Sequence, residues 1–174
     1  MKRRIFLQGI GVVIALPVIS LYLTEKISAN TVNPVLVAPL DKPHDAWRDL
    51  VSPEAYKVLF EEQTELPGSS KLNHEHRDGT YICAACYLPL FESQHKYESA
   101  TGWPSFTQPI AGHVGTKRDY KLIVLRTEYH CAHCGGHQGH VFKDGPKPRG
   151  ERWCNNGLAL RFVLRTDEFP LLRG

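Results

Sequence analysis

The sequence predicts a mainly β domain of the α+β class, with short helices confined to its N-terminal part. Runs of β-favouring residues separated by glycine and proline turns follow one another beyond residue 79: Thr80–Cys83, Lys121–Tyr129, Gly139–Phe142 and Trp153–Leu164. In the last run, large apolar residues recur at every second position from Leu158 to Leu164. This alternation indicates a strand with one buried face.

Helix signals lie upstream of these strands. Ser52-Pro53-Glu54 places a capping hydroxyl before a proline at the first helical position, so we expect a helix from there to about Gln63. Residues 45–50 are expected to form a shorter helix. A chain of 174 residues suits one domain of ordinary size plus a tail. We therefore expect a proline-containing linker over 30–44, a domain over 45–168 and a C-terminal tail over 169–174.

The first 29 residues have the features of a targeting segment. Arg3-Arg4 precedes an uncharged, mostly apolar stretch over residues 10–23, a pattern typical of the twin-arginine export signal of bacteria. The stretch is shorter than the about 20 residues that span a bilayer. Ile27-Ser28-Ala29 is a poor cleavage site, however, so an uncleaved membrane anchor stays open as an alternative. We expect an exported, periplasmic protein, tethered to the membrane if the signal is retained.

The charge distribution argues against a nucleic-acid partner. The formal net charge of +3 arises within residues 1–29, which hold four cationic side chains and one acidic side chain. The rest of the chain is formally neutral and offers no basic surface for a phosphate backbone.

Four of the five cysteines form two C-x-x-C pairs, Cys83/Cys86 and Cys131/Cys134. Two such pairs can present four thiolates in the tetrahedral arrangement that structural Zn²⁺ prefers. Two disulfides, or a redox-active C-x-x-C pair, are the alternatives. A four-thiolate zinc site leaves no coordination position for water, so the metal is expected to be structural, with no organic cofactor.

The remaining cysteine, Cys154, is either a small buried apolar residue or a reactive thiol. Its surroundings favour reactivity. Arg152, two residues away on the same strand face, can stabilise a thiolate, and Asn156 offers an amide donor. The segment from His137 to Asp144 supplies His137 and His140, which can donate protons near neutral pH.

Three ordered blocks carry a family resemblance. They are residues 97–106 (YESATGWPSF), 136–144 (GHQGHVFKD) and 152–162 (RWCNNGLALRF). These blocks resemble the signature blocks of the peptide methionine-R-sulfoxide reductases, the MsrB family. The resemblance covers about residues 45–168. It implies two antiparallel sheets with short N-terminal helices, stapled by zinc, and selectivity for the R epimer of methionine sulfoxide.

The resemblance also assigns roles to individual residues. Cys154 matches the nucleophile, whereas His137, His140 and Asn156 match the polar groups around the sulfoxide oxygen. The matching substrate-binding and supporting positions are Trp103, Phe106, Asp144 and Arg152, and the matching zinc ligands are Cys83, Cys86, Cys131 and Cys134. One departure stands out, because Thr101 occupies the position of the second, resolving cysteine of many members.

These residues suggest a mechanism in which the Cys154 thiolate attacks the sulfoxide sulfur while His140, helped by His137 and Asn156, donates to the oxygen. Cys154 is then left as a sulfenic acid, which a thioredoxin-like thiol donor would reduce. The expected substrates are oxidised proteins, with free methionine sulfoxide as a second candidate, and the expected role is protein repair. A zinc-ribbon interaction module and a zinc hydrolase are the rival functions, but neither uses Cys154, and a hydrolase needs an open metal position.

Overall fold

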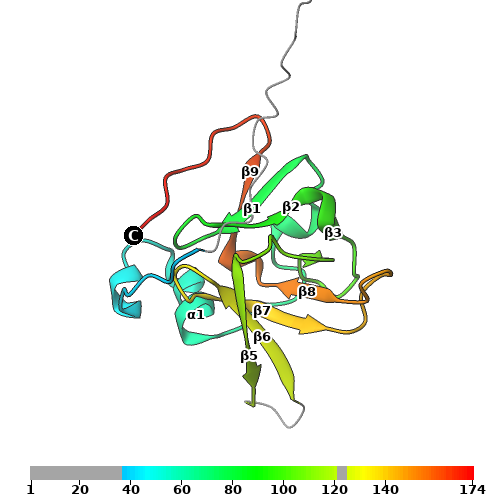
Figure 1. The fold of residues 1–174 in the computed structure, drawn as a ribbon, viewed down its shortest axis with the longest axis horizontal. Helices are drawn as coiled ribbons and strands as arrows, with labels where there is room; N and C mark the ends of the chain where they lie inside the picture. Colours follow the sequence, from blue (N-terminus) through cyan, green and yellow to red (C-terminus); the bar gives the residue numbers. More distant parts are fainter. Residues whose placement is uncertain (1–36, 121–124) are drawn as a thin grey trace, which may run out of the picture.

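The computed structural model describes residues 37–120 and 125–174, and Figure 1 shows their arrangement. The predicted export signal over residues 1–29 and the first part of the predicted linker lie outside the described residues. Within the described ranges, no helix has both the length and the apolar character needed to cross a bilayer.

In the described residues, nine strands form two antiparallel sheets. The smaller sheet has the order β2-β1-β9, and its strands are β1 (Gly79–Cys83), β2 (Pro89–Glu92) and β9 (Leu160–Leu164). The larger sheet has the order β3-β4-β8-β7-β6-β5, and its strands are β3 (Lys96–Tyr97), β4 (Ser105–Phe106), β5 (Val114–Asp119), β6 (Arg126–Cys131), β7 (His137–Phe142) and β8 (Arg152–Asn155). The predicted architecture is therefore confirmed.

The N-terminal helices form where the capping signals predict them. The Oγ atom of Ser52 accepts a hydrogen bond of 3.2 Å from the backbone N–H of Ala55, and α1 covers Pro53–Glu61. The helix ends before Gln63 because Glu62 adopts a left-handed conformation, with φ of 54°. Shorter 3-10 turns complete the helical part: η1 (His44–Trp47), η2 (Lys71–His74), η3 (Ser93–His95) and η4 (Gly157–Ala159).

Aromatic side chains from both sheets make the core between them. Phe91 of the smaller sheet stacks on Phe106 of the larger one, with ring centroids 4.2 Å apart, and Tyr81 meets Phe106 edge-on at 4.9 Å. Tyr129 packs edge-on against Trp153 at 5.0 Å. Full burial of a side chain such as Phe91 stabilises the fold by roughly 1.5–3 kcal/mol. This packing fixes the position of β8, the strand that carries Cys154.

The strand predicted over Trp153–Leu164 is two strands in different sheets. The predicted strand start at Leu158 is wrong, because η4 separates β8 from β9 and the second strand begins at Leu160. The carboxylate of Glu65 accepts hydrogen bonds from the backbone N–H groups of Gly157 (2.6 Å) and Leu158 (2.9 Å), and these bonds hold the turn. The chain can therefore cross from one sheet to the other directly after Asn155, the residue that follows Cys154 and ends β8.

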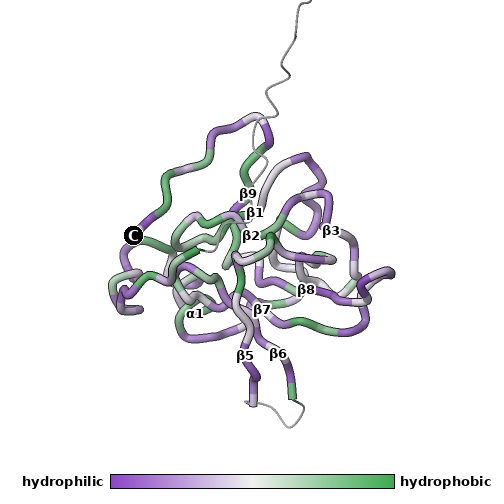
Figure 2. The backbone as a smooth tube through the Cα atoms, in the orientation of Figure 1, coloured by the Kyte–Doolittle hydropathy of each residue, from purple (hydrophilic) through white to green (hydrophobic). Residues whose placement is uncertain are grey.

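Strand β5 forms one edge of the larger sheet. Figure 2 shows hydrophilic residues along its outer half, where Lys117 and Arg118 lie. Charged side chains on an edge strand oppose pairing with another chain.

Candidate active site

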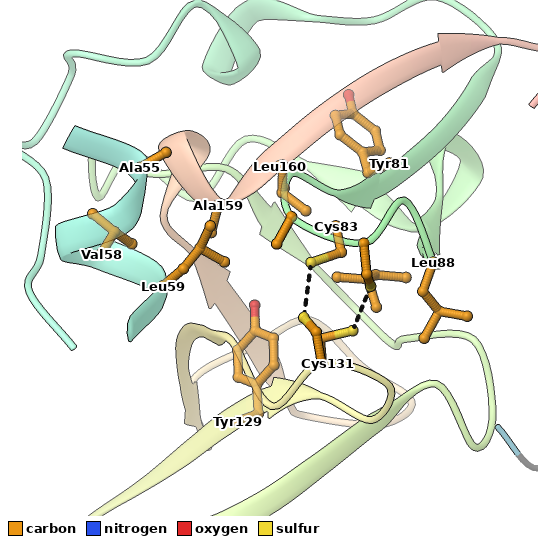
Figure 3. Close-up of a cluster of buried hydrophobic side chains, with 14 of the residues drawn as sticks. Ala55, Val58, Leu59, Tyr81, Cys83, Leu88, Tyr129, Cys131, Ala159 and Leu160 are labelled. Atoms are coloured by element: carbon orange, nitrogen blue, oxygen red, sulfur yellow. Dashed lines mark hydrogen bonds between the residues drawn. The ribbon is translucent and has the colours of Figure 1, made fainter. Parts of the chain in front are cut away.

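The four cysteines of the C-x-x-C pairs meet between the two sheets. Their sulfur atoms all lie within 4.8 Å of one another. Sγ of Cys83 lies 3.6 Å from Sγ of Cys134, and the sulfurs of Cys86 and Cys131 are 3.5 Å apart (Figure 3). A disulfide requires about 2.05 Å, whereas tetrahedral zinc with Zn–S bonds of about 2.3 Å separates its sulfurs by about 3.8 Å. The donor set therefore fits a structural zinc ion, as predicted.

The two C-x-x-C turns have the same backbone design. The N–H of Tyr87 donates to the carbonyl of Cys83 at 3.0 Å, and the N–H of Gly135 donates to the carbonyl of Cys131 at 3.0 Å. Tyr87 and Gly135 each adopt a positive φ, 69° and 73°, four residues after the first cysteine of their pair. Cys83 ends β1 and Cys131 ends β6, so a zinc ion held by these cysteines would join the two sheets, and its binding energy would contribute directly to folding.

Both ends of the described chain pack on these turns. The N–H of Leu40, in the predicted linker, donates to the carbonyl of His133 at 2.7 Å. In the predicted tail, the N–H of Arg173 donates to the carbonyl of Cys86 at 2.9 Å, and its guanidinium lies 4.1 Å from the ring centre of Tyr87. Figure 1 shows the C-terminus beside the first described residues. The linker and tail thus help to cover the zinc site.

A separate cavity of about 110 Å³ lies on the larger sheet, and its lining residues are Thr64, Trp103, Arg126, Gly139, His140, Phe142, Cys154, Asn155 and Asn156. Strand pairing brings the reactive groups together: Cys154 on β8 lies opposite His140 on β7 and opposite Ser105 on β4. Directly paired residues share one face of a sheet. Three segments distant in sequence therefore converge at the sulfur of Cys154.

Opposing effects act on the thiol of Cys154. Burial raises its pKa, whereas the positive charge of Arg152 and hydrogen bonds from Thr101 and Ser105 lower it; burial prevails. Arg152 is held in place by two 2.9 Å hydrogen bonds to the carboxylate of Asp144. Its guanidinium also lies 4.3 Å from the ring centre of Phe142. The cation that favours the thiolate is therefore fixed beside it, as the sequence predicts.

His140 is oriented by a buried carboxylate. Its Nε2 atom lies 2.8 Å from Oδ2 of Asp119, and the same oxygen accepts a 2.6 Å hydrogen bond from Arg126. Burial lowers the pKa of His140, and the hydrogen bond to Asp119 partly opposes that effect. Because Asp119 engages Nε2, Nδ1 is the ring nitrogen left for the pocket.

His137 lies behind His140 and is not part of the cavity lining. Its Nδ1 atom lies 3.0 Å from Oε1 of Glu128, and Lys117 approaches the other carboxylate oxygen at 3.3 Å. The centroids of the two imidazole rings are 5.4 Å apart, and the ring planes make an angle of 66°. His137 can therefore act on the substrate oxygen only through His140 or through the charge that it contributes.

Trp103 and Asn156 form part of the cavity wall, and Glu65 anchors both. The indole Nε1 of Trp103 donates to the carbonyl of Glu65 at 3.2 Å, and Oδ1 of Asn156 accepts from the N–H of Glu65 at 3.1 Å. Nδ2 of Asn156 donates to the carbonyl of Gln138 at 3.0 Å. The second hydrogen on Nδ2 is therefore the donor that Asn156 has for the pocket.

Phe106 is the exception among the predicted substrate-binding residues. It is fully buried and stacks on Phe91, because neighbouring residues of a strand point to opposite faces and Ser105 occupies the face of Cys154. We therefore assign Phe106 to the core. Asp144 and Arg152 lie beside the cavity, where they fix charge near Cys154.

Sequence reasoning missed Thr64, Asp119 and Arg126. Asp119 and Arg126 face each other across β5 and β6, as the last residue of β5 and the first residue of β6. Their opposite charges were visible in the sequence, but the register that pairs them was not. Thr64 precedes Glu65 in a segment without strand or helix, and no local pattern marks it.

The chain is similar to known proteins over most of the domain that contains this site. Residues 51–164 match the SelR domain. A peptide methionine sulfoxide reductase MsrB from Bradyrhizobium diazoefficiens is 51% identical over 69% of this chain and 87% of that protein. A protein of the same name from Leptospira interrogans is 44% identical over 71% of this chain and 95% of that protein. Another from Pseudomonas putida is 46% identical over 70% of this chain and 93% of that protein.

The matched segment contains both C-x-x-C turns, the cavity residues on β7 and β8, and Trp103. It covers well over half of the chain. The chain therefore belongs to the SelR-domain family, that of the MsrB methionine sulfoxide reductases.

Proposed function

We propose that this protein is a zinc-containing peptide-methionine (R)-S-oxide reductase that uses Cys154 as its nucleophile. The observation that carries the proposal is the pairing of Cys154 with His140 on adjacent strands, at a cavity walled by Trp103. A nucleophile and a proton donor thus face one small space with an aromatic wall. Such a wall suits the methyl group of methionine sulfoxide.

The chemistry transfers the sulfoxide oxygen to Cys154. The thiolate attacks the sulfoxide sulfur and forms an S–S bond, and the imidazolium of His140 supplies a proton to the oxygen. The hydroxyl group then passes to Cys154: an S–O bond to Cys154 forms as the substrate S–O bond and the S–S bond break, which releases methionine. Methionine sulfur is reduced by two electrons, and Cys154 is oxidised to a sulfenic acid.

An external thiol completes the cycle. The chain has five cysteines, and four of them belong to the zinc site, so none is left to attack oxidised Cys154. Thr101 stands beside Cys154 but its alcohol is a far weaker nucleophile than a thiolate. A thioredoxin-like dithiol attacks the sulfenic sulfur and expels water. Its second thiol then releases reduced Cys154 and leaves the donor as a disulfide.

The substrate is methionine sulfoxide in oxidised proteins, and free methionine sulfoxide is a smaller substrate of the same site. The protein works in the bacterial periplasm after export by the twin-arginine route, tethered to the membrane when the signal is retained. Arg3-Arg4 and the apolar stretch over residues 10–23 support this location. Substitution of both arginines by lysine should keep the protein in the cytoplasm of fractionated cells, and unchanged export would refute the route.

The activity is tested with a peptide that carries either the R or the S epimer of methionine sulfoxide, a dithiol donor and zinc-loaded protein. We expect consumption of the R epimer alone and no turnover by Cys154→Ser. The Cys154→Ser variant should keep its zinc and its circular dichroism spectrum. Trp103→Ala should bind substrate more weakly. Equal rates on both epimers, or turnover by Cys154→Ser, would refute the proposal.

A further inference from the structure

Three hydroxyl groups lie close together on the side of Cys154 opposite His140. Ser105 on β4 pairs directly with Cys154, whereas His140 pairs with it from β7. The Oγ atoms of Ser99 and Ser105 are 2.7 Å apart, and Oγ of Ser99 lies 2.8 Å from Oγ1 of Thr101. We call Ser99, Thr101 and Ser105 the hydroxyl trio.

The backbone between β3 and β4 brings the trio together. Ala100, between Ser99 and Thr101, has a φ of 57°, and Gly102 has a φ of 92°. A positive φ costs a residue with a side chain about 1 kcal/mol or more, so it persists only where the surroundings impose it. This turn lets Ser99 and Thr101 contact each other while Ser105 stays fully buried beside Cys154.

The trio can adapt to both chemical states of the sulfur. Each hydroxyl carries one proton and can also accept hydrogen bonds. Toward a thiolate, Thr101 and Ser105 donate their protons to the sulfur, and Ser99 donates to one of them. Toward a sulfenic acid, Thr101 can turn and accept the new S–O–H proton. Ser105 can then donate to the carbonyl of Trp103, 3.2 Å away.

We propose that the hydroxyl trio is a positioning device that stabilises the Cys154 thiolate before the reaction and keeps the sulfenic acid protonated after it. This inference rests on the proposed function. A protonated sulfenic acid is a weaker nucleophile than its anion. Attack on hydrogen peroxide, which breaks the O–O bond and yields sulfinic acid and water, is therefore slowed until an external thiol arrives.

The thiolate half of the proposal is tested without substrate. In zinc-loaded protein, the rate of Cys154 alkylation by iodoacetamide is measured against pH in the wild type, Thr101→Val and Thr101→Ser. Loss of a hydrogen bond to the thiolate should raise the alkylation midpoint of Thr101→Val by about one pH unit. Thr101→Ser should restore the wild-type midpoint. An isosteric control, Thr107→Val, removes a hydroxyl that contacts the carbonyl of His95 and should leave the midpoint unchanged.

The sulfenic half is tested by one turnover with the R-sulfoxide peptide without a thiol, followed by hydrogen peroxide and mass spectrometry of Cys154. Sulfinic acid should form roughly three to ten times faster in Thr101→Val than in wild type and Thr101→Ser, the range that loss of one hydrogen bond produces. Equal rates and equal alkylation midpoints would overturn the proposal.

Two further experiments test the proposal if Thr101→Val does not fold or if the sulfoxide is not reduced. If Thr101→Val does not fold, Ser99→Ala is used instead, because Ser99 contacts Thr101 and Ser105 rather than the sulfur itself. It should shift the alkylation midpoint and the rate of sulfinic acid formation in the same directions as Thr101→Val. If the wild type fails to turn over the sulfoxide, the function proposed above is wrong. The alkylation midpoint, together with sulfenic acid formed by one equivalent of peroxide, still tests the trio.

Discussion

The zinc site and the pocket surround their cysteine side chains differently. Cys83, Cys86 and Cys131 are fully buried and Cys134 is 5% exposed, each sulfur surrounded by the other sulfurs. Cys154 is only partly buried and faces a cavity, with Arg152 and two hydroxyl groups close to its sulfur. Metal coordination makes a thiolate inert, whereas a cation and hydrogen-bond donors leave it nucleophilic.

A buried polar chain joins the two regions. Nε2 of Gln138 donates to the sulfur of Cys83 at 3.6 Å, and Oε1 of Gln138 accepts from Nδ2 of Asn155 at 3.4 Å. Oδ1 of Asn155 in turn accepts from the hydroxyl of Tyr129 at 2.6 Å. Asn155 directly follows Cys154 on β8. The zinc site therefore helps to fix the strand that carries Cys154.

Removal of one zinc ligand should have the largest effect. Structural zinc contributes about 10–16 kcal/mol in small zinc domains, as much as or more than the 5–15 kcal/mol that stabilises a typical domain. We expect Cys131→Ser to lose zinc and the cooperative unfolding transition, measured by metal analysis and circular dichroism. Cys154→Ser is the matched control, with one zinc per chain and an unchanged transition. Folded, zinc-free Cys131→Ser would show that the metal is dispensable.

Loss of the proton donor should reduce the rate without unfolding the protein. General acid catalysis contributes typically 10²–10⁴-fold, so His140→Asn should lower kcat/KM by about that factor. The exposed His76, whose imidazole lies 3.7 Å from the carboxylate of Glu98, provides the control His76→Asn, whose rate should equal that of the wild type. A loss of less than tenfold in His140→Asn would assign proton donation to another group.

The pH profile should separate the two proposed catalytic groups, His140 and Cys154. The pKa of His140 is lowered and that of Cys154 is raised, yet the reaction needs imidazolium and thiolate. The active fraction of the enzyme, in which His140 is protonated and Cys154 is deprotonated, rises with pH up to the pKa of His140. It stays level between the two pKa values and falls above the pKa of Cys154. The acid limb of kcat/KM therefore reports His140 and the alkaline limb reports Cys154.

Two variants test this assignment of the limbs. Asp119→Asn removes the hydrogen bond that raises the pKa of His140, so the acid limb should move to lower pH. Arg152→Met removes a charge that lowers the pKa of Cys154, so the alkaline limb should move to higher pH. Each pKa unit should lower the plateau about tenfold. If Asp119→Asn moved the alkaline limb and Arg152→Met moved the acid limb, the acid limb would report Cys154 and the alkaline limb His140.

The sequence predicted those parts of the molecule that depend on local signals. Ser52 and Pro53 marked the start of α1, and the matched C-x-x-C spacing marked the zinc site. It did not separate β8 from β9, because the buried contact of Glu65 with Gly157 that holds the turn joins residues 92 positions apart.

The candidate site divides in the same way. The motifs identified Cys154 and His140, but their adjacency depends on strand register, which local patterns do not give. Phe106 was misassigned because its motif does not say which strand face it takes. Asp119 was missed because it reaches His140 only through the β5–β7 arrangement.

The smallest effect concerns the tail over the zinc site. Arg173 contacts Tyr87, whose positive φ the first C-x-x-C turn requires, and its side chain donates to the carbonyl of Leu50 at 2.7 Å. A cation–π contact and a hydrogen bond are each worth about 1 kcal/mol or less at such partly exposed sites. Arg173→Ala should therefore release zinc to a chelator no more than about tenfold faster. Catalysis should stay unchanged, because the tail is remote from the cavity lining.

Arg118→Ala is the control for this variant, because Arg118 is exposed on β5, away from both C-x-x-C turns. It should release zinc at the wild-type rate. Equal release rates for Arg173→Ala and Arg118→Ala would mean that the tail rests on the turn without stabilising it. Faster zinc release together with a lower kcat/KM would instead indicate that a change in the first C-x-x-C turn alters the position of β8 through Gln138. The zinc site and the pocket would then be structurally coupled.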